Sequence, residues 1–181
     1  MIDILTLCTG NICRSPMAEV FLARRLEEFG VAAHVHSAGL LDDGRPAQGV
    51  DVLAAMGFDT SAHRSRRMTA EMVEGADLVL CMAREHLREA VLLSPTAWPR
   101  SFTLKEIVRR GEQAGPRAAG QPFDEWVAKL HAGRTRVGLL GSSDEDDIAD
   151  PIGGSRTVYK TSATEIQALT DRLAGLAWER N

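Results

Sequence analysis

Hydrophobic positions along this chain alternate between short continuous runs and stretches with helical spacing. A short apolar run at residues 2–7 suits a buried strand of a parallel sheet, and residues 31–37, 78–82 and 101–104 are interpreted as three further strands. Between and after these runs, apolar residues recur every three or four positions, as expected for helices that bury one face. Helices are therefore predicted at residues 15–29, 48–56, 84–93, 105–110, 123–130 and 155–178, with another beginning after Thr69.

The order of these elements indicates the fold class. Strands that alternate with helices predict a parallel sheet with helices on both faces. The chain has 181 residues, the length of one domain. We therefore expect a single α/β domain over residues 1–181, with a four-stranded sheet. Glycine, proline and acidic residues are frequent in residues 111–147, where we expect a partly mobile insertion without an assigned role.

The connection between the first strand and the first helix has the sequence Cys8-Thr9-Gly10-Asn11-Ile12-Cys13-Arg14-Ser15-Pro16. A loop in this position directs backbone N–H groups and the positive end of a helix at an oxyanion, and an arginine can bind two of its oxygens. We therefore expect residues 9–15 to bind phosphate and Cys8 to be a nucleophilic thiolate. Ser15 can donate a hydrogen bond to that thiolate, cap the helix, or do both.

This segment closely resembles the phosphate-binding loop of the low-molecular-weight protein tyrosine phosphatases, which also lies at the N-terminus. The resemblance covers roughly residues 1–110 and 147–179. It implies an enzyme that hydrolyses phosphorylated protein side chains or a small phosphomonoester through a cysteinyl-phosphate intermediate, without a metal or another cofactor. In this mechanism Cys8 is the nucleophile and Arg14 stabilises the charge that develops at phosphorus.

A general acid must come from elsewhere in the chain. Asp150 lies in the sequence Ala149-Asp150-Pro151-Ile152-Gly153-Gly154, which by itself is typical of an ordinary turn. The phosphatases that the chain resembles carry a C-terminal Asp-Pro motif whose aspartate is the general acid. The resemblance therefore implies that Asp150 protonates the leaving group.

Three further positions are interpreted as support for the loop. Asn11 tolerates left-handed backbone conformation and can tie the loop with its amide. Ser37, in a Ser-Ala-Gly sequence, and His63, ahead of a basic cluster, resemble family residues that hydrogen-bond this asparagine from behind. From its sequence context alone, His63 fits a surface loop equally well.

The type of phosphorylated side chain stays open. The family usually follows Asp-Pro with an aromatic residue, but this chain has Ile152, and residues 40–44 also lack the aromatic side chain of tyrosine-specific members. Residues 102–106, 153–155 and 159–160 resemble the protein-arginine phosphatase branch. That branch carries threonine where this chain has Ile12, so phosphotyrosine and phosphoarginine are both retained.

Composition excludes several classes of protein. A net charge of −4 argues against an electrostatic nucleic-acid binder. No apolar stretch approaches membrane-spanning length, and the first residues lack the pattern of a secretory signal. We expect a cytoplasmic protein without a nucleic-acid or membrane partner, and its oligomeric state is left open.

The cysteines, Cys8, Cys13 and Cys81, are too few for a disulfide framework and do not form the ligand pattern of a structural zinc site. Cys81 lies in an apolar run and is interpreted as a core residue. Cys13 is close enough in sequence to fold back toward Cys8. We predict that Cys8 oxidises first to a sulfenic acid and that Cys13 then forms a disulfide with it.

Two other functions are retained as alternatives. Thioredoxin-coupled arsenate reductases share this fold and loop, but they need further cysteines after the third strand, and residues 82–94 contain none. A non-catalytic phosphate-binding module needs neither a thiol nor an acid. The combination of Cys8, Arg14 and Asp150 disfavours such a module, whereas the departure at Ile152 keeps it open.

Overall fold

The computed structural model describes residues 1–41 and 44–178. Its sheet consists of β1 (Ile2–Cys8), β2 (Ala33–Gly39), β3 (Leu78–Cys81) and β4 (Ser101–Thr103), in the spatial order β2-β1-β3-β4. All neighbouring strands are parallel, which confirms the predicted four-stranded α/β sheet. Because β1 is a central strand, its carboxyl end lies where open α/β sheets bind ligands.

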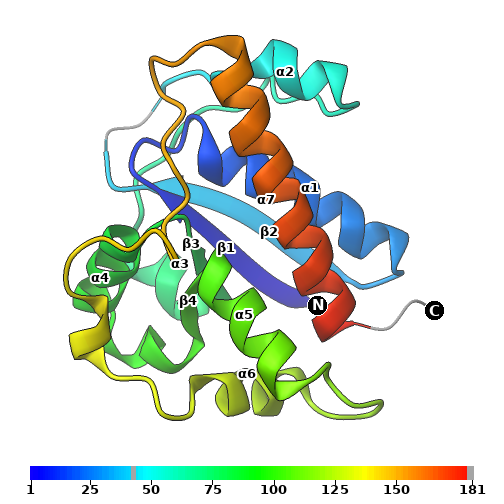
Figure 1. The fold of residues 1–181 in the computed structure, drawn as a ribbon, viewed down its shortest axis with the longest axis vertical. Coiled ribbons are helices and arrows are strands. Elements are labelled where there is room, and N and C mark those ends of the chain that lie inside the picture. The colour runs from blue at the N-terminus through cyan, green and yellow to red at the C-terminus, as the bar shows by residue number, and fades with distance from the viewer. Residues whose placement is uncertain (42–43, 179–181) are drawn as a thin grey trace.

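Helices cover both faces of this sheet (Figure 1). On one face α1 and α5 both pack against α7, and Figure 1 shows α7 crossing the sheet beside α1. The other face is covered by α3, α4 and a 3-10 helix, Pro95–Arg100. The helices are α1 (Arg14–Glu28), α2 (Val50–Ala55), α3 (Ala70–Gly75), α4 (Arg84–Leu93), α5 (Leu104–Ala114), α6 (Phe123–His131) and α7 (Arg156–Ala177).

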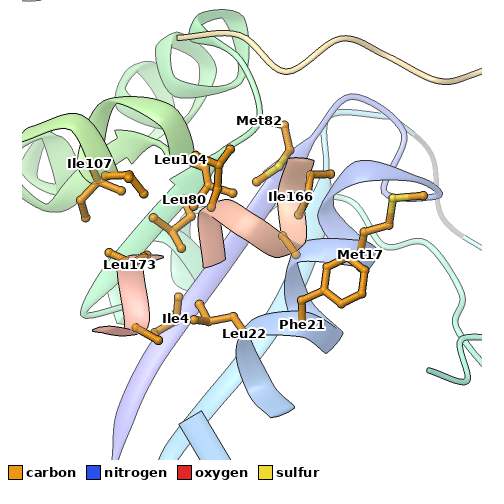
Figure 2. Close-up of a cluster of buried hydrophobic side chains, with 14 of the residues drawn as sticks. Ile4, Met17, Phe21, Leu22, Leu80, Met82, Leu104, Ile107, Ile166 and Leu173 are labelled. Atoms are coloured by element: carbon orange, nitrogen blue, oxygen red, sulfur yellow. The ribbon is translucent and has the colours of Figure 1, made fainter. Parts of the chain in front are cut away.

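Each face of the sheet buries its own hydrophobic cluster, because successive side chains of a strand point to opposite faces. Ile4 and Leu80 belong to the larger cluster, which joins the sheet to α1, α5 and α7 (Figure 2). Leu5 and Val79 belong to the cluster beneath α3 and α4. The two central strands, β1 and β3, are thus buried on both faces, which explains why their sequences are mostly apolar.

The starts of the first helix and of the second strand differ from those predicted. The first helix begins at Arg14 with Cys13 in the N-cap position, so Ser15 lies inside the first turn and does not cap it. The second strand begins at Ala33 and not at residue 31, because Val31 N–H donates to Leu26 O and still belongs to the turn after α1. Residues 42–43, part of a predicted loop, lie outside the described residues.

Residues 111–147 pack against the rest of the domain. The segment contains the end of α5, the whole of α6 and a 3-10 helix, Arg136–Leu139. Trp126 is fully buried, and the Arg134 side chain, which is 1% exposed, lies 2.8 Å from Glu106. These contacts show that the segment contributes to the core, whereas the mobility of any part of it stays a prediction. No helix within residues 1–41 and 44–178 is both long and apolar enough to cross a membrane.

Candidate active site

Cys8 ends β1 and lies at the base of the loop, with 2% of its surface exposed. Its Sγ lies 3.0 Å from Ser15 Oγ, so the serine contacts the thiol and takes no part in capping the helix. Cys8 pairs across the sheet with Gly39, at which a Cβ would lie only 2.8 Å from the backbone N of Asn11. Strand pairing therefore brings the thiol, the loop and the end of β2 together, and glycine is the residue that permits this close approach.

Asn11 connects the loop to its surroundings from inside the protein. It has a φ of +47°, which places it in the left-handed region that asparagine tolerates. Its Nδ2 donates to Ser15 Oγ at 3.0 Å and to Ser37 Oγ at 2.7 Å, and its Oδ1 accepts from Arg66 N at 2.9 Å. Asn11, Ser15 and Ser37 are fully buried. A fully satisfied polar network of this kind makes the loop rigid.

His63 and Arg66 hold the loop from the chain segment between α2 and α3. His63 Nε2–H donates to the backbone oxygen of Asn11 at 2.7 Å, and Arg66 Nε–H donates to the backbone oxygen of Ser37 at 2.8 Å. The structure thus places both predicted support residues beside Asn11, Ser37 at its amide and His63 at its carbonyl. Arg66 was not singled out from the sequence.

Arg14 links the loop to the segment that carries Asp150. Its guanidinium donates to the backbone oxygen of Ile148 at 3.0 Å and to Asp150 Oδ2 at 2.6 Å. Arg14 is 4% exposed, and its Nε is buried without a hydrogen-bond partner. Asp150 Oδ1 accepts from Ile152 N at 3.2 Å, which fixes the turn around Pro151. The predicted nucleophile, arginine and acid therefore lie at one edge of the sheet.

Charged residues hold the segment before Asp150 in place. Asp146 lies 2.7 Å from Arg84 and 2.7 Å from Arg109. Burial raises the pKa of Asp146, but the hydrogen bonds from Arg109 and Arg84 outweigh it and keep that pKa below its usual value. Asp147 Oδ1 accepts from Arg84 N at 2.7 Å. The acid side of the site thus depends on ion pairs with α4 and α5.

Thr9 is bound by residues at the start of α4. Thr9 Oγ1 lies 2.9 Å from Nε2 of the fully buried His86 and donates to Glu85 Oε1 at 3.2 Å. Arg14 donates weakly to the same hydroxyl at 3.4 Å. Burial and the charges of Arg14 and Arg88 lower the pKa of His86 to about 3, so its ring is neutral at pH 7.

Cys13 faces the final helix. Its thiol donates to the hydroxyl of Tyr159 at 3.8 Å, and that hydroxyl donates to Gln48 Oε1 at 2.7 Å. Burial raises the pKa of Cys13 to about 11 and the pKa of Tyr159 to about 12. At neutral pH Cys13 is therefore a thiol, which is a weak nucleophile until it loses its proton.

The side chains at the mouth of the site are aliphatic. Ile152 is 51% exposed and Leu41 is 49% exposed, whereas Ile12 is buried. Arg45 adds a positive charge beside the loop, because a Cβ on Gly10 would lie 3.6 Å from its NH1. Trp126 lies in the core and supplies no aromatic wall.

Three residues whose contacts with the loop were not predicted come from distant parts of the chain, and Tyr159 among them was noted in the sequence only for its resemblance to the phosphatase family. Arg66, His86 and Tyr159 all contact loop residues, but none belongs to a local motif with the loop. One available signal was the sequence Arg84-Glu85-His86, which follows a predicted strand and so had to lie at the carboxyl edge of the sheet.

Within residues 1–41 and 44–178, the one group of His, Cys, Asp and Glu side chains with metal-ligand spacing is Asp3, His34 and His36, at the other end of β1.

Comparisons with known proteins identify the family. Residues 3–132 match the family model described as low molecular weight phosphotyrosine protein phosphatase. The chain belongs to this family. It is 35% identical over 126 residues to the low molecular weight protein-tyrosine-phosphatase Etp of Escherichia coli K12, covering 69% of this chain and 84% of Etp. The family is a class of cysteine-dependent, metal-independent phosphatases, so the chain is a protein phosphatase of this type.

Two arginine phosphatases match almost the whole chain. The protein-arginine-phosphatase of Geobacillus stearothermophilus is 33% identical over 178 residues, covering 94% of this chain and 93% of that protein. A solved structure of a YwlE arginine phosphatase, a serine-for-cysteine mutant with a phosphorylated active-site serine, superposes with a TM-score of 0.71. It is 29% identical and covers 96% of this chain and 94% of that one. These matches include residues 111–147, to which the resemblance seen in the sequence did not extend.

Proposed function

We propose that this phosphatase acts on phosphotyrosine or phosphoarginine side chains of proteins, with Cys8 as nucleophile, Arg14 as phosphate ligand and Asp150 as general acid. The observation that carries the proposal is the geometry of Arg14. It begins the helix after the loop, it contacts Asp150 at 2.6 Å, and its buried Nε–H has no partner. A phosphate oxygen in the loop would satisfy that donor, because arginine binds oxyanions with two N–H groups.

The reaction takes two steps. The thiolate of Cys8 attacks phosphorus, the bond between phosphorus and the leaving group breaks, and Asp150 gives its proton to the departing oxygen or nitrogen. A water molecule then attacks phosphorus and gives a proton to Asp150, and the bond between phosphorus and the Cys8 sulfur breaks. Inorganic phosphate leaves, and the Cys8 thiolate is regenerated. Bound phosphate competes with Asp150 for Arg14, which frees the carboxyl group to reach the leaving group. The phosphorylated serine of the YwlE mutant supports a covalent intermediate at this position.

The phosphate site consists of the backbone and side chains of residues 9–15, at the positive end of α1. Ser15 Oγ, 3.0 Å from the Cys8 thiol, stabilises the thiolate by hydrogen bonding. Ser37 and His63 keep the loop in shape through Asn11 and do not contact the substrate. Because these hydrogen bonds form without substrate, the loop is rigid before any substrate binds.

The experiment that tests the function measures kcat/KM on peptides carrying phosphotyrosine, phosphoarginine or phosphoserine. Wild-type protein should hydrolyse one of the first two best, and activity should survive EDTA. Cys8→Ser should abolish turnover while phosphate still protects the protein against heat. Turnover of Cys8→Ser near the wild-type rate would disprove the role of Cys8, and a preference for phosphoserine would disprove the substrate class.

The aliphatic mouth distinguishes the two substrates. Ile152→Tyr adds an aromatic surface, which contributes about 0.5–1.5 kcal/mol to stacking and should lower KM for aryl phosphates roughly two- to tenfold. Phosphoarginine should gain less, and Ile152→Leu serves as the control.

Ile12→Thr tests the resemblance to arginine phosphatases by introducing the threonine that they carry at this position, and kcat/KM should shift toward phosphoarginine. An unchanged ratio in both variants would mean that other residues set the preference.

The redox role of Cys13 also stays a proposal. Oxidised Cys8 forms a disulfide with Cys13 only if the buried Cys13 thiol loses its contact with Tyr159 and its proton. After treatment with peroxide and then a thiol reductant, wild-type protein should recover activity and Cys13→Ala should recover poorly. Equal recovery would leave Cys13 as a packing residue. A cytoplasmic location, where such a reductant is present, fits three free cysteines.

A further inference from the structure

We propose that Asp3, His34 and His36 form a binding site for a divalent transition-metal ion of the Zn²⁺ class. The site lies at the amino end of β1, whereas Cys8 lies at its carboxyl end. Asp3 and Cys8 lie five positions apart on one extended strand, a distance of about 16 Å at roughly 3.3 Å per residue. The proposed site is therefore separate from the catalytic one.

The register of the sheet brings the three side chains together. Asp3 of β1 pairs with His34 of β2, and His36 follows two residues later on the same face of β2. The two imidazole rings stack with their centroids 4.7 Å apart. Asp3 Oδ2 lies 2.7 Å from His34 Nδ1, and Asp3 Oδ1 lies 2.8 Å from His36 Nε2. The possible ligand atoms all lie within 4.8 Å of one another, so little rearrangement is needed to bind one ion.

The surrounding charge favours a cation. Asp77 Oδ2 accepts a hydrogen bond from the backbone N–H of Asp3 at 2.8 Å, which places a second carboxylate beside the group. Exposure also fits an open coordination position, because the side chains of His34 and Asp3 are 54% and 32% exposed while that of His36 is 10% exposed. Water can fill the remaining position, as it does when zinc has three protein ligands.

The ligand types select the class of ion. Two imidazoles and one carboxylate suit Zn²⁺, Co²⁺, Ni²⁺ or Cu²⁺, whereas Ca²⁺ and Mg²⁺ prefer sites made of oxygen atoms. Zinc bonds of about 2.0–2.2 Å separate neighbouring tetrahedral ligands by roughly 3.4 Å, so each carboxylate oxygen must move roughly 0.6–0.7 Å away from its ring nitrogen. His34 Nδ1 and His36 Nε2 must be unprotonated, and each neutral ring then carries its proton on the other nitrogen.

Zinc titration of the untagged, full-length Cys8→Ser protein tests this proposal. The Cys8→Ser background removes the reactive thiol of the active site as a competing ligand. Calorimetry should show one zinc ion per chain, and Tm should rise with zinc concentration because the ion binds the folded state. Co²⁺ should give the visible absorption of a site with nitrogen ligands.

Matched variants in the same background identify the ligands. His34→Gln, His36→Gln and Asp3→Asn should each weaken zinc binding at least about tenfold, the smallest loss typical of changes around a metal site. His131→Gln and Asp59→Asn, which remove a histidine and an exposed carboxylate elsewhere, should bind zinc like the parent. His34 is half exposed, so His34→Gln should fold even if His36→Gln does not. Absence of stoichiometric binding, or binding that His34→Gln and Asp3→Asn leave unchanged, would overturn the proposal.

Discussion

The two sides of the active site are built from different interactions. On the side of Cys8, the loop is held by buried hydrogen bonds of Asn11 to Ser15, Ser37 and Arg66. On the side of Asp150, the chain is held by ion pairs of Asp146 with α4 and α5 and by the contact of Asp150 with Arg14. Neutral buried networks resist changes in salt and impose one geometry, whereas partly exposed ion pairs respond to salt and pH.

This difference fits the tasks of the two sides. The loop must present donors to the charge that develops at phosphorus, and such donors work best when they are already in place. The acid must contact Arg14 in one state and a leaving group in another, which a turn held by charges permits. Four predictions test the comparison, from the largest expected effect to the smallest.

Asp150→Ala tests the chemistry of the acid side. Loss of a general acid should lower kcat roughly 10²–10⁴-fold for leaving groups that need a proton, because that step contributes this much to catalysis. The defect should shrink for activated aryl phosphates, whose leaving groups depart as anions. Rates across a series of aryl phosphates measure this, and Asp150→Asn controls for the shape of the side chain. A defect of equal size for every leaving group would remove Asp150 from its role.

Asn11→Ala tests the neutral network on the loop side. It removes the acceptor of the partly buried Arg66 N–H and the buried donor to Ser15 and Ser37, which should cost about 1–3 kcal/mol of unfolding free energy and also lower kcat. Asn11→Gly removes the same amide but suits the positive φ, so it should be more stable than Asn11→Ala by about 1 kcal/mol. Denaturant unfolding gives both values. Full stability of both variants would mean that the loop does not depend on this network.

His86 should make the stability of the loop side depend on pH. Its pKa is about 3 in the folded protein because burial and two arginines disfavour the charged ring, against about 6.5 in an unfolded chain. Between these values the unfolded state binds a proton that the folded state does not, so stability falls as pH falls, by at most about 1.4 kcal/mol per pH unit. His86→Gln should flatten the plot of unfolding free energy against pH over this range. A slope identical to that of the wild type would contradict the burial of a neutral ring.

Asp146→Asn should have the smallest effect, on the acid side. It removes a carboxylate charge that Arg84 and Arg109 stabilise, which should lower the free energy of unfolding by about 1 kcal/mol at pH 7. The pKa of Asp146 is lower in the folded protein than in the unfolded chain, so the carboxylate stabilises the fold fully at pH values above its unfolded pKa. That stabilisation is lost as the pH falls through the folded pKa. The Tm difference from wild type should shrink at high salt, and it should also shrink once the pH is below the lowered pKa of Asp146 in the folded protein. Asp144→Asn, on an exposed neighbour, is the control, and a difference that salt leaves unchanged would argue against ion pairing.

Much of the fold and part of the site could be predicted because the signals are local. The apolar run before Cys8 and the helical spacing after Pro16 predict strand, loop and helix from neighbouring residues alone. The same spacing places a thiol and an arginine at the two ends of one loop. The partners of that loop could not be predicted in this way, because Arg66, His86 and Tyr159 meet it only after distant segments have packed.

The sequence by itself determined that the domain is α/β with four parallel strands, but not the order of those strands in the sheet. It determined the phosphate loop almost completely, since all of that loop's residues are consecutive. Tertiary structure decided that Ser15 contacts the Cys8 thiol and does not cap a helix. It also decided that Trp126 is a core residue and that Asp3 meets two histidines. Ser15 meets Cys8, seven positions away, because the loop between them curves back. Asp3 meets its histidines through strand register, which joins residues more than thirty positions apart and leaves no periodic pattern in the sequence.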